Sequence, residues 1–316
     1  MDKKLRVAVI GCGGRGRGHL KILSGFEDVN LVAVCDPVEN ARNSSGDSFN
    51  VTNRYESIDA LLDKEELDAV FVATPAHLNG EAALPCFERG IDTLLEKPPG
   101  MSVEETITLR DTAKQTNAKG MVGWNRRFHP IIVQAKQMVM DRGPVTQVVG
   151  EFHKSITRLA QSGIFPEILM DNMFLETPIH ALDTIRAIAE SDVQEVHSIV
   201  KRTISDYKDV HAALILFENG CVAQHIANYT TDARLERYEI HGRNISAYLE
   251  GVGQGTVYCD GTHHKLTDAG SGGTVQQNRY FLDCVRDNTP IALPAANLDE
   301  AVKTMQLADQ ILKSTR

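Results

Sequence analysis

The sequence lacks several features that would place a 316-residue chain in a specialised class. No apolar run approaches the roughly 18 residues of a membrane-spanning helix, and Lys3, Lys4 and Arg6 lead into a strand pattern instead of a signal-peptide core. There is no basic tract, aromatic residues make up 6%, and the formal net charge is −9. We therefore expect a cytoplasmic protein that binds small molecules and contacts neither nucleic acid nor a membrane.

Cysteines are few and scattered. The six cysteines include no C-x-x-C pair, so neither a disulfide framework nor a thiolate metal site is predicted. The adjacent His263 and His264 would point to opposite faces of a strand, with no carboxylate at ligand spacing, so no metal is predicted there. Repeats are also missing, and the one glycine-rich loop, at 270–273, is expected to be mobile at the surface.

The first 36 residues carry the most informative motif. An apolar strand expected at 5–10 runs into Gly-x-Gly-x-x-Gly, and a second strand at 30–35 ends at Asp36. Such glycines permit a tight turn, close approach of a pyrophosphate to the backbone, and close packing of the following helix. The loop residues expected at a dinucleotide are Gly11, Gly13, Gly14, Arg15 and Gly16.

Asp36 bears on which dinucleotide is bound. An aspartate at this strand end accepts hydrogen bonds from both hydroxyls of an adenosine ribose, whereas a 2′-phosphate would meet a like charge. The motif therefore predicts NAD as the cofactor. Arg15, Arg17 and Arg42 are close in sequence, so NADP stays open as an alternative.

The chain has two parts with different sequence patterns. Alternating strand and helix patterns up to residue 123 predict a parallel sheet covered by helices on both faces, with strands at 5–10, 30–35, 68–73, 92–96 and 119–123. After Trp124, alternating segments and glycine-rich turns predict a large, mostly antiparallel sheet, with strands at 145–153, 194–203, 210–218, 221–229, 235–241, 245–250 and 255–259. Helices are expected at 131–141, 175–190, 275–287 and 298–313. The fold class is therefore α/β, with a Rossmann domain at 1–123 and an α+β domain with an open sheet at 124–316.

Ligands of an open parallel sheet bind outside the carboxyl ends of its strands, so residues just after each strand are candidates. Three groups qualify: Thr74-Pro75-Ala76-His77, Glu96-Lys97-Pro98-Pro99-Gly100 and Trp124-Asn125-Arg126-Arg127. A free lysine titrates near about 10.4, so Lys97 would need burial and a neighbouring nicotinamide cation to serve as a base near neutral pH. The alternative is a surface lysine paired with Glu96.

These segments together resemble the glucose-fructose oxidoreductase / inositol dehydrogenase / rhizopine-catabolism (Gfo/Idh/MocA) family. The resemblance covers nearly the whole chain and includes Glu96-Lys97-Pro98 and Asn125-Arg126-Arg127-Phe128. It implies a nicotinamide-dependent oxidoreductase of sugars or polyols, with Lys97 as a catalytic and binding residue. It also implies a second domain that covers the substrate and often forms a dimer interface. The cofactor residues expected after the strands are Thr74, Pro75, His77, Asn79, Glu96, Lys97, Asn125 and Arg126.

The stretch that ends at Asp183 resembles the family's Asp-x-Gly-x-His-x-x-Asp segment, which makes His180 the matching acid/base residue. On one helix over 175–190, Glu176, His180 and Asp183 would share a face and converge on a ligand. We expect Lys97 and His180 to exchange the hydroxyl proton while Glu176 orients substrate. Without the resemblance, a lone histidine among apolar helix residues is more often part of the core.

The sequence departs from the family at several pocket positions. Glu176 replaces the usual aspartate, Pro178 the usual glycine, and Ala76 and Asn79 the common Asn and His after Thr-Pro. These changes predict an unusual substrate or, in the extreme, a weakened site. The expected substrate-binding residues are Lys97, Arg127, His153, Lys154, Arg158, Asn172, Glu176 and His180, with Asp171 nearby. Lys154 and Arg158 are either a clamp for a phosphate or carboxylate, or ordinary solvated charges.

Other functions stay open on sequence alone. The fold also supports sensors that bind dinucleotides and sugar-like ligands without turnover, and reductases of non-sugar carbonyls. The presence of both Lys97 and His180 favours an enzyme, and the modest aromatic content disfavours a large planar substrate. Because one face of the antiparallel sheet is expected to lack helices, we expect a homodimer or homotetramer.

Overall fold

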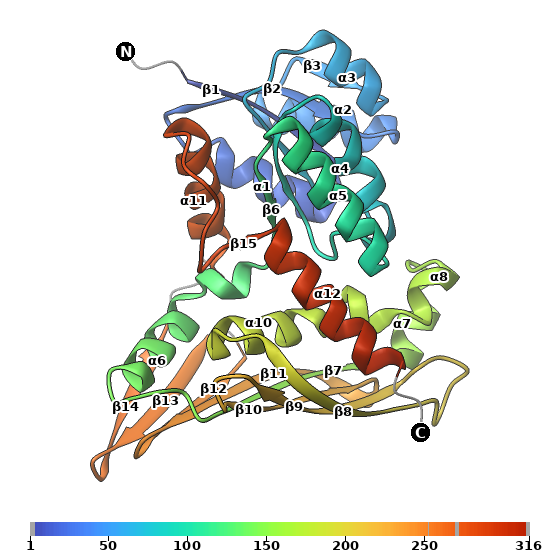
Figure 1. Ribbon diagram of the computed structural model, residues 1–316. Coiled ribbons are helices and arrows are strands. Elements are labelled where there is room, and N and C mark those ends of the chain that lie inside the picture. The colour runs from blue at the N-terminus through green and yellow to red at the C-terminus, as the bar shows by residue number, and fades with distance from the viewer. Residues whose placement is uncertain (1–3, 252, 269–271, 314–316) are drawn as a thin grey trace. The chain divides into compact units, whose positions relative to one another are not determined.

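The computed structural model describes residues 4–251, 253–268 and 272–313 (Figure 1). The chain divides into two compact units, Met1–Gly123 with Val275–Val302, and Trp124–Thr274 with Lys303–Arg316. The sequence-based boundary puts 275–302 in the second domain, but this segment packs with the first unit. The reason is that β15 (Ala296–Asn297) pairs with β6 (Gly120–Val122) and that α11 (Thr274–Arg286) is joined by ion pairs to the first unit.

The first unit is built on a seven-stranded sheet in the order β15-β6-β5-β4-β1-β2-β3, parallel except for β15. The remaining strands are β1 (Leu5–Ile10), β2 (Val29–Cys35), β3 (Asn53–Tyr55), β4 (Ala69–Val72) and β5 (Asp92–Leu95). The helices are α1 (Gly14–Leu23), α2 (Glu39–Phe49), α3 (Ile58–Lys64), α4 (Asn79–Glu88), α5 (Val103–Thr116) and α11, with the 3-10 turn η1 (Ala76–Leu78). All four residues of β4 are fully buried, as expected for a central strand covered on both faces.

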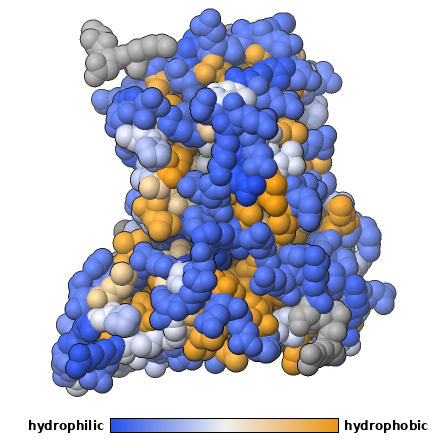
Figure 2. Space-filling model, viewed as in Figure 1, coloured by the Kyte–Doolittle hydropathy of each residue, from blue (hydrophilic) through white to orange (hydrophobic). Residues whose placement is uncertain are grey.

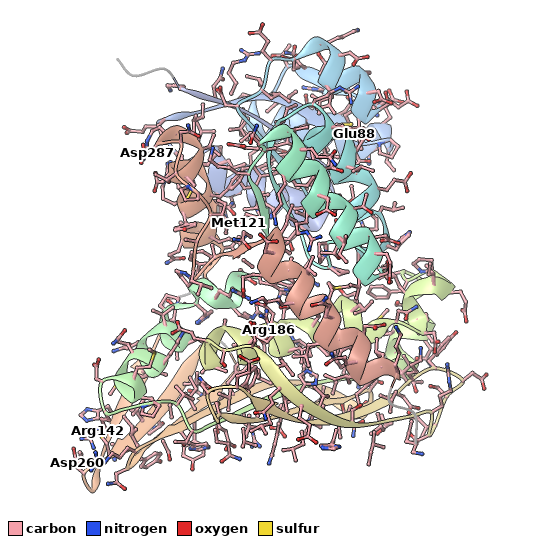
Figure 3. All side chains as sticks on the ribbon, in the orientation of Figure 1. Glu88, Met121, Arg142, Arg186, Asp260 and Asp287 are labelled. Carbon is pink, nitrogen blue, oxygen red and sulfur yellow. The ribbon has the colours of Figure 1, made fainter. Side chains whose placement is uncertain are left out.

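The second unit contains an eight-stranded sheet in the order β14-β13-β12-β11-β7-β10-β9-β8, antiparallel except between β7 and β10. The strands are β7 (Gln147–Ser155), β8 (Val193–Lys201), β9 (Val210–Phe217), β10 (Val222–Asn228), β11 (Thr230–Gly242), β12 (Ile245–Glu250), β13 (Gln254–Cys259) and β14 (Thr262–Thr267). The ion pair between Arg142 and Asp260 lies at one end of this sheet (Figure 3).

Helices cover one face of the second sheet. They are η2 (Asn125–Phe128), α6 (Pro130–Met140), α7 (Ile156–Ser162), α8 (Glu167–Met170), α9 (Met173–Glu176) and α10 (Ile179–Ala189), while α12 (Leu298–Lys313) runs from the first unit into the second. Helix α10 packs so closely on β7 that a Cβ at Gly150 would lie 2.9 Å from Ile185 Cδ1. Among the described residues, no helix lies on the opposite face of this sheet (Figure 1).

The parallel sheet and the second, mostly antiparallel sheet confirm the predicted fold class. The short strands β3 and β15 and the helices α7 and α8 were not expected, whereas β14 contains His263 and His264, which were expected on a strand. The helix expected over 175–190 is two helices, because Pro178 has no amide hydrogen to continue α9 and instead starts α10. Of the loop expected at 270–273, residues 270 and 271 lie outside the described residues.

The described helices include none that is both long and apolar enough to cross a membrane. The visible surface of the first unit is mostly hydrophilic (Figure 2). The six cysteines form no disulfide, and five of them are buried.

Candidate active site

The glycine-rich loop connects β1 to α1, beside the point where the strand order reverses between β1 and β4. Gly11 has a φ of +91°, and a Cβ there would lie 2.4 Å from the Ala73 oxygen, while a Cβ at Gly16 would lie 1.8 Å from the Gly11 oxygen. By contrast, no described atom lies within 4 Å of a Cβ built at Gly13 or Gly14. Helix α1 also begins without a side-chain cap or an acidic residue in its first turn. The loop therefore presents open backbone at a helix N-terminus, which fits a pyrophosphate.

Asp36 is fixed beside this loop. Its Oδ2 accepts a hydrogen bond from the Cys12 amide at 2.7 Å, and its Oδ1 accepts one from the Val38 amide at 2.8 Å. Arg42 donates to the backbone oxygen of Asp36 at 2.6 Å, and Arg17 donates to hydroxyls on α2. Arg17 and Arg42, two of the three arginines that left NADP open, thus bind other groups, and the carboxylate of Asp36 fits a dinucleotide with a free ribose 2′-hydroxyl.

Glu96 follows β5 and is the centre of a buried polar network. Its Oε1 accepts hydrogen bonds from Arg15 Nε at 2.6 Å and from His19 Nε2 at 2.9 Å, and His19 Nδ1 lies 3.0 Å from Asn278 Nδ2. Burial raises the pKa of Glu96, but the charge of Arg15, the hydrogen bond and charge of His19 and the charge of Lys97 lower it to about 2. His19 and Asn278 were missed from the sequence, because they are 259 positions apart.

Lys97 follows Glu96 directly and is half-buried. Asn79, expected at the cofactor, is instead fully buried: its Nδ2 donates to the Pro98 oxygen at 3.2 Å, and its Oδ1 accepts from the Thr74 hydroxyl at 2.9 Å. Asn79 therefore joins the loop after β4 to the loop that carries Lys97. Its neighbours Pro75 and His77, also expected at the cofactor, are exposed and half-buried.

Asn125 and Arg126, also expected at the cofactor, belong to the second unit and bind residues of that unit. Asn125 Nδ2 donates to the Gly272 oxygen at 2.8 Å, and Arg126 donates to both carboxylate oxygens of Glu236 at 2.7 and 2.9 Å. Burial raises the pKa of Glu236, but the hydrogen bonds and charge of Arg126 and a hydrogen bond from Tyr238 hold it below its ordinary value. The side chains therefore stabilise the second unit itself.

Arg127 and Asp183 form a buried, two-pronged ion pair instead of facing a ligand. Both side chains are 0% exposed, and two hydrogen bonds of 2.8 Å join them. The Thr304 hydroxyl donates to Asp183 at 3.0 Å and accepts from Arg186, labelled on α10 in Figure 3, at 2.8 Å. This corrects two expectations: Arg127 does not point to a substrate, and Asp183 does not converge with Glu176. Both side chains instead fix α10 to η2 and α12.

Lys154 and Glu176 are brought together by the structure. Lys154 Nζ lies 3.5 Å from Glu176 Oε2 and donates to the Thr177 hydroxyl at 2.7 Å, and this hydroxyl also contacts Glu176. His180 lies in the first turn of α10 and is 8% exposed. Because Glu176 is the last residue of α9 and His180 lies in the first turn of α10, the two do not share one helix face as expected.

Three other expected substrate residues point elsewhere. Arg158 pairs with Asp232 at 2.7 Å, with both side chains largely exposed, so it forms no clamp with Lys154. On β7, His153 points to the sheet face opposite Lys154, because neighbouring strand residues alternate. The ring Nδ1 of His153 accepts from an amide hydrogen on β10, and Asn172 donates to a backbone oxygen on α8.

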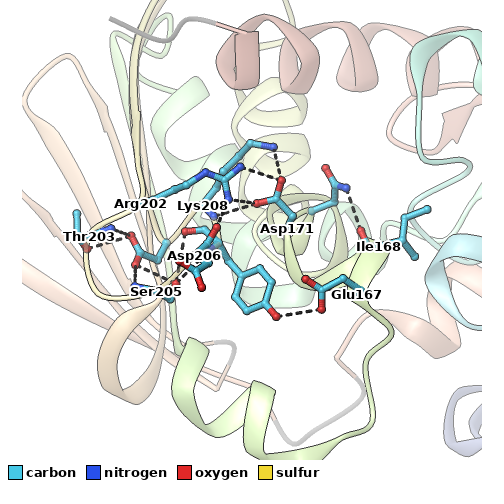
Figure 4. A network of polar contacts seen from close by, with 11 residues as sticks. Glu167, Ile168, Asp171, Arg202, Thr203, Ser205, Asp206 and Lys208 are labelled. Carbon is cyan, nitrogen blue, oxygen red and sulfur yellow. Dashed lines mark hydrogen bonds and ion pairs between the residues drawn. The ribbon is translucent and has the colours of Figure 1, made fainter.

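Asp171 anchors the segment before Glu176 (Figure 4). Its carboxylate accepts hydrogen bonds from Arg202 and from Lys208 Nζ at 3.1 Å, both in the loop between β8 and β9. Burial raises the pKa of Asp171, but the hydrogen bonds from these two cations hold it below the ordinary value. In the same loop the Tyr207 hydroxyl donates to Glu167 on α8 at 3.0 Å. The loop therefore fixes α8 and α9 in the second unit.

Two buried histidines lie under α9 and α10 and were not found from the sequence. The Phe174 ring lies 4.9 Å from the ring of His211 and 5.2 Å from that of His225. His225 Nε2 donates to the Pro178 oxygen at 3.2 Å, at the start of α10. Burial lowers the pKa of each histidine to about 4, so both are neutral at neutral pH.

Metal coordination finds no support in the described part of the chain, where no three His, Cys, Asp or Glu side chains gather in a way that could hold an ion. His263 and His264, considered as ligands above, both lie on β14.

The two units match the two parts of one family of oxidoreductases. Residues 5–124 match the model described as "Oxidoreductase family, NAD-binding Rossmann fold", and residues 132–248 match the "GFO/IDH/MocA C-terminal domain". The chain belongs to the GFO/IDH/MocA family. The resemblance inferred from the motifs is therefore confirmed, and with it NAD as the dinucleotide of the first unit.

Two characterised relatives span most of the chain. It is 25% identical over 319 residues to scyllo-inositol 2-dehydrogenase (NAD(+)) of Bacillus subtilis (strain 168), covering 92% of this chain and 89% of that protein. It is 28% identical over 247 residues to UDP-N-acetylglucosamine 3-dehydrogenase of Acidithiobacillus ferrooxidans, covering 78% and 74%. The fold is that of aldose-aldose oxidoreductase from Caulobacter crescentus, with a TM-score of 0.88 at 20% identity over 99% of this chain and 97% of that one.

Proposed function

We propose that this GFO/IDH/MocA oxidoreductase transfers a hydride between nicotinamide and the CH–OH carbon, or the corresponding carbonyl, of a sugar, sugar derivative or cyclitol. The observation that carries the proposal is the placement of Lys97 at the carboxyl edge of the sheet whose switch point holds the glycine loop and Asp36. Relatives named as scyllo-inositol and UDP-N-acetylglucosamine dehydrogenases support this substrate class.

Each residue has a defined part in the proposed reaction. NAD, when bound, supplies the hydride chemistry. Lys97 and His180, the residues that match the family's lysine and histidine, exchange the proton of the reacting hydroxyl, and an imidazole suits this exchange at physiological pH. Glu176 orients substrate hydroxyls, and Lys154 and Thr177 fix its carboxylate. Two cofactor candidates, Thr74 and Glu96, support the loops instead through the contacts described above.

Turnover by the purified protein tests the proposal. NAD or NADP is offered with myo-inositol, scyllo-inositol, aldoses, sugar phosphates and UDP-N-acetylglucosamine, and nicotinamide absorbance is followed. Lys97→Ala and His180→Ala should each lower kcat by about 100-fold or more, while Lys21→Ala, an exposed lysine on α1, should not. Turnover of Lys97→Ala within a few-fold of wild type would refute its role. Tight binding of NAD without turnover of any of these compounds would instead favour a sensor.

We also propose that the chain forms a homodimer or homotetramer through the uncovered face of the second sheet. Ile199 and Leu214 are 54% and 47% exposed there, and with Ala212 and Ile226 they line a groove of about 790 Å³. An apolar sheet face of this kind is commonly covered by another subunit. Ile199→Glu should shift sedimentation toward the monomer, and a wild-type monomer at micromolar concentration would overturn the proposal.

A cytoplasmic location is proposed from the six cysteines, none of which forms a disulfide. Reduced thiols persist in reducing compartments, whereas secreted proteins more often pair them. Cell fractionation tests this directly.

A further inference from the structure

The ion pair between Arg15 and Glu96 joins the two segments of the first unit on which the proposed function depends. Arg15 lies in the first turn of α1, directly after the open glycines, and Glu96 immediately precedes Lys97. Arg15 Nε and His19 Nε2 share one acceptor, the Oε1 atom of Glu96, at 2.6 and 2.9 Å. The dinucleotide loop and the lysine loop therefore meet at a single carboxylate oxygen.

The two partners differ in their access to water. The Glu96 side chain is 5% exposed, whereas that of Arg15 is 43% exposed. A carboxylate withdrawn from water stays charged only when cations and hydrogen-bond donors surround it. Burial raises the pKa of Glu96, yet its neighbours, Arg15 foremost, lower it to about 2. Glu96 is therefore an anion at neutral pH, and its charge acts on the adjacent Lys97.

We propose that Arg15 is a positioning residue that acts on Lys97 through Glu96, by balancing the charge of the carboxylate that stands next to the lysine. Without the guanidinium, Lys97 would adjoin an uncompensated anion, which stabilises the ammonium form. With it, the ammonium form gains less, and the lysine releases its proton more readily. Such release is what proton exchange with a substrate hydroxyl requires, so this inference rests on the proposed function of Lys97.

Helices α1, α5 and α11 and the end of β6 lie near the ion pair between Arg15 and Glu96. Helix α1 supplies Arg15 and His19, and α11 supplies only the neutral amide of Asn278. His19 Nε2 lies 2.9 Å from Glu96 Oε1, and the amide nitrogen of Asn278 lies 3.0 Å from His19 Nδ1. From α5, the Glu105 carboxylate is engaged by a backbone amide at 2.7 Å. Directly after β6 lies Gly123, where an added Cβ would lie 3.1 Å from Glu96 Oε1. This glycine brings no charge to the carboxylate.

Competitive labelling of Lys97 measures its protonation without any need for turnover. Acetic anhydride reacts with the uncharged amine, so the intact protein is labelled over a range of pH, with and without NAD, and the peptide that contains Lys97 is quantified by mass spectrometry. Arg15→Gln should move the midpoint of labelling to higher pH, and Glu96→Gln should move it to lower pH, each by about half a unit or more. Arg17→Gln is the matched control, because it removes the same charge from the same helix but binds serine hydroxyls on α2. It should leave the midpoint unchanged.

The directions in which Arg15→Gln and Glu96→Gln shift the labelling midpoint of Lys97 test the proposal. Opposite shifts support the proposal, whereas shifts in the same direction, or none, mean that the pair is only structural and overturn it. Arg15→Lys keeps the charge and should restore the wild-type midpoint, which also keeps the test decisive if Glu96→Gln does not fold. Retained turnover of Lys97→Ala would overturn the proposed function alone, because the labelling does not depend on activity.

Discussion

Replacement of Asp183 by alanine should destabilise the second unit by about 3–5 kcal/mol. The side chains of Asp183 and Arg127 are both 0% exposed and joined by two hydrogen bonds of 2.8 Å. The change leaves the buried guanidinium charge without this carboxylate and removes an acceptor of the Thr304 hydroxyl. Most of the loss comes from the buried charge, because one hydrogen bond between neutral groups contributes only about 1 kcal/mol.

Trp124 provides the assay. It is the single tryptophan, is 1% exposed, and lies in the second unit with the Arg127 guanidinium 6.0 Å from its ring. Its fluorescence during urea unfolding therefore reports on the unit that holds the pair. Arg158→Ala is the control, because its exposed pair with Asp232 should contribute at most about 1 kcal/mol. A loss for Asp183→Ala no larger than the control would refute the reasoning, as would failure of the double variant Arg127→Met, Asp183→Leu to recover part of it.

Asp36→Ser should weaken NAD binding by about tenfold and strengthen NADP binding, because it removes both the ribose acceptor and the like charge; equilibrium titration with each dinucleotide measures this. Gly13→Ala should fold normally but bind NAD weakly, because its Cβ would occupy open space that the pyrophosphate needs. Gly16→Ala should also lower the melting temperature, because its Cβ would lie 1.8 Å from a backbone oxygen. The pKa values of His211 and His225 are lowered from 6.5 to about 4, so the unfolded chain binds more protons than the folded chain between these pH values. The free energy of unfolding should therefore fall as the pH drops from about 6.5 to 4, by up to about 3 kcal/mol for each histidine. His225→Gln should flatten this dependence in urea titrations at several pH values, and an unchanged slope would contradict the assignment.

The sequence predicted those parts of the site whose chemistry is local along the chain. The glycine loop and Asp36 lie within 36 residues of the start, so one strand-helix-strand unit contains the whole motif. The placement of Lys97 could also be predicted, because it follows directly on the strand expected at 92–96. Each of these conclusions needed only the neighbours in sequence.

The roles that the sequence did not reveal depend on distant partners or on one backbone detail. Arg127 reads as a ligand contact until Asp183, 56 positions away, is placed beside it. His153 and Lys154 are neighbours in sequence, but strand alternation sends them to opposite faces of the sheet. Glu176 and His180 have the spacing of one helix face, and Pro178 alone divides them.

The return of Val275–Val302 to the first unit has a consequence for the order in which the protein is made. Synthesis proceeds from the N-terminus, so the edge strand β15 and the Asn278 amide leave the ribosome only after residues 124–274 of the second unit have been made. The second unit can therefore start to fold while the NAD-binding sheet still lacks its last strand. A nascent chain stalled before residue 296 would leave β6 as an open edge that invites pairing with other chains.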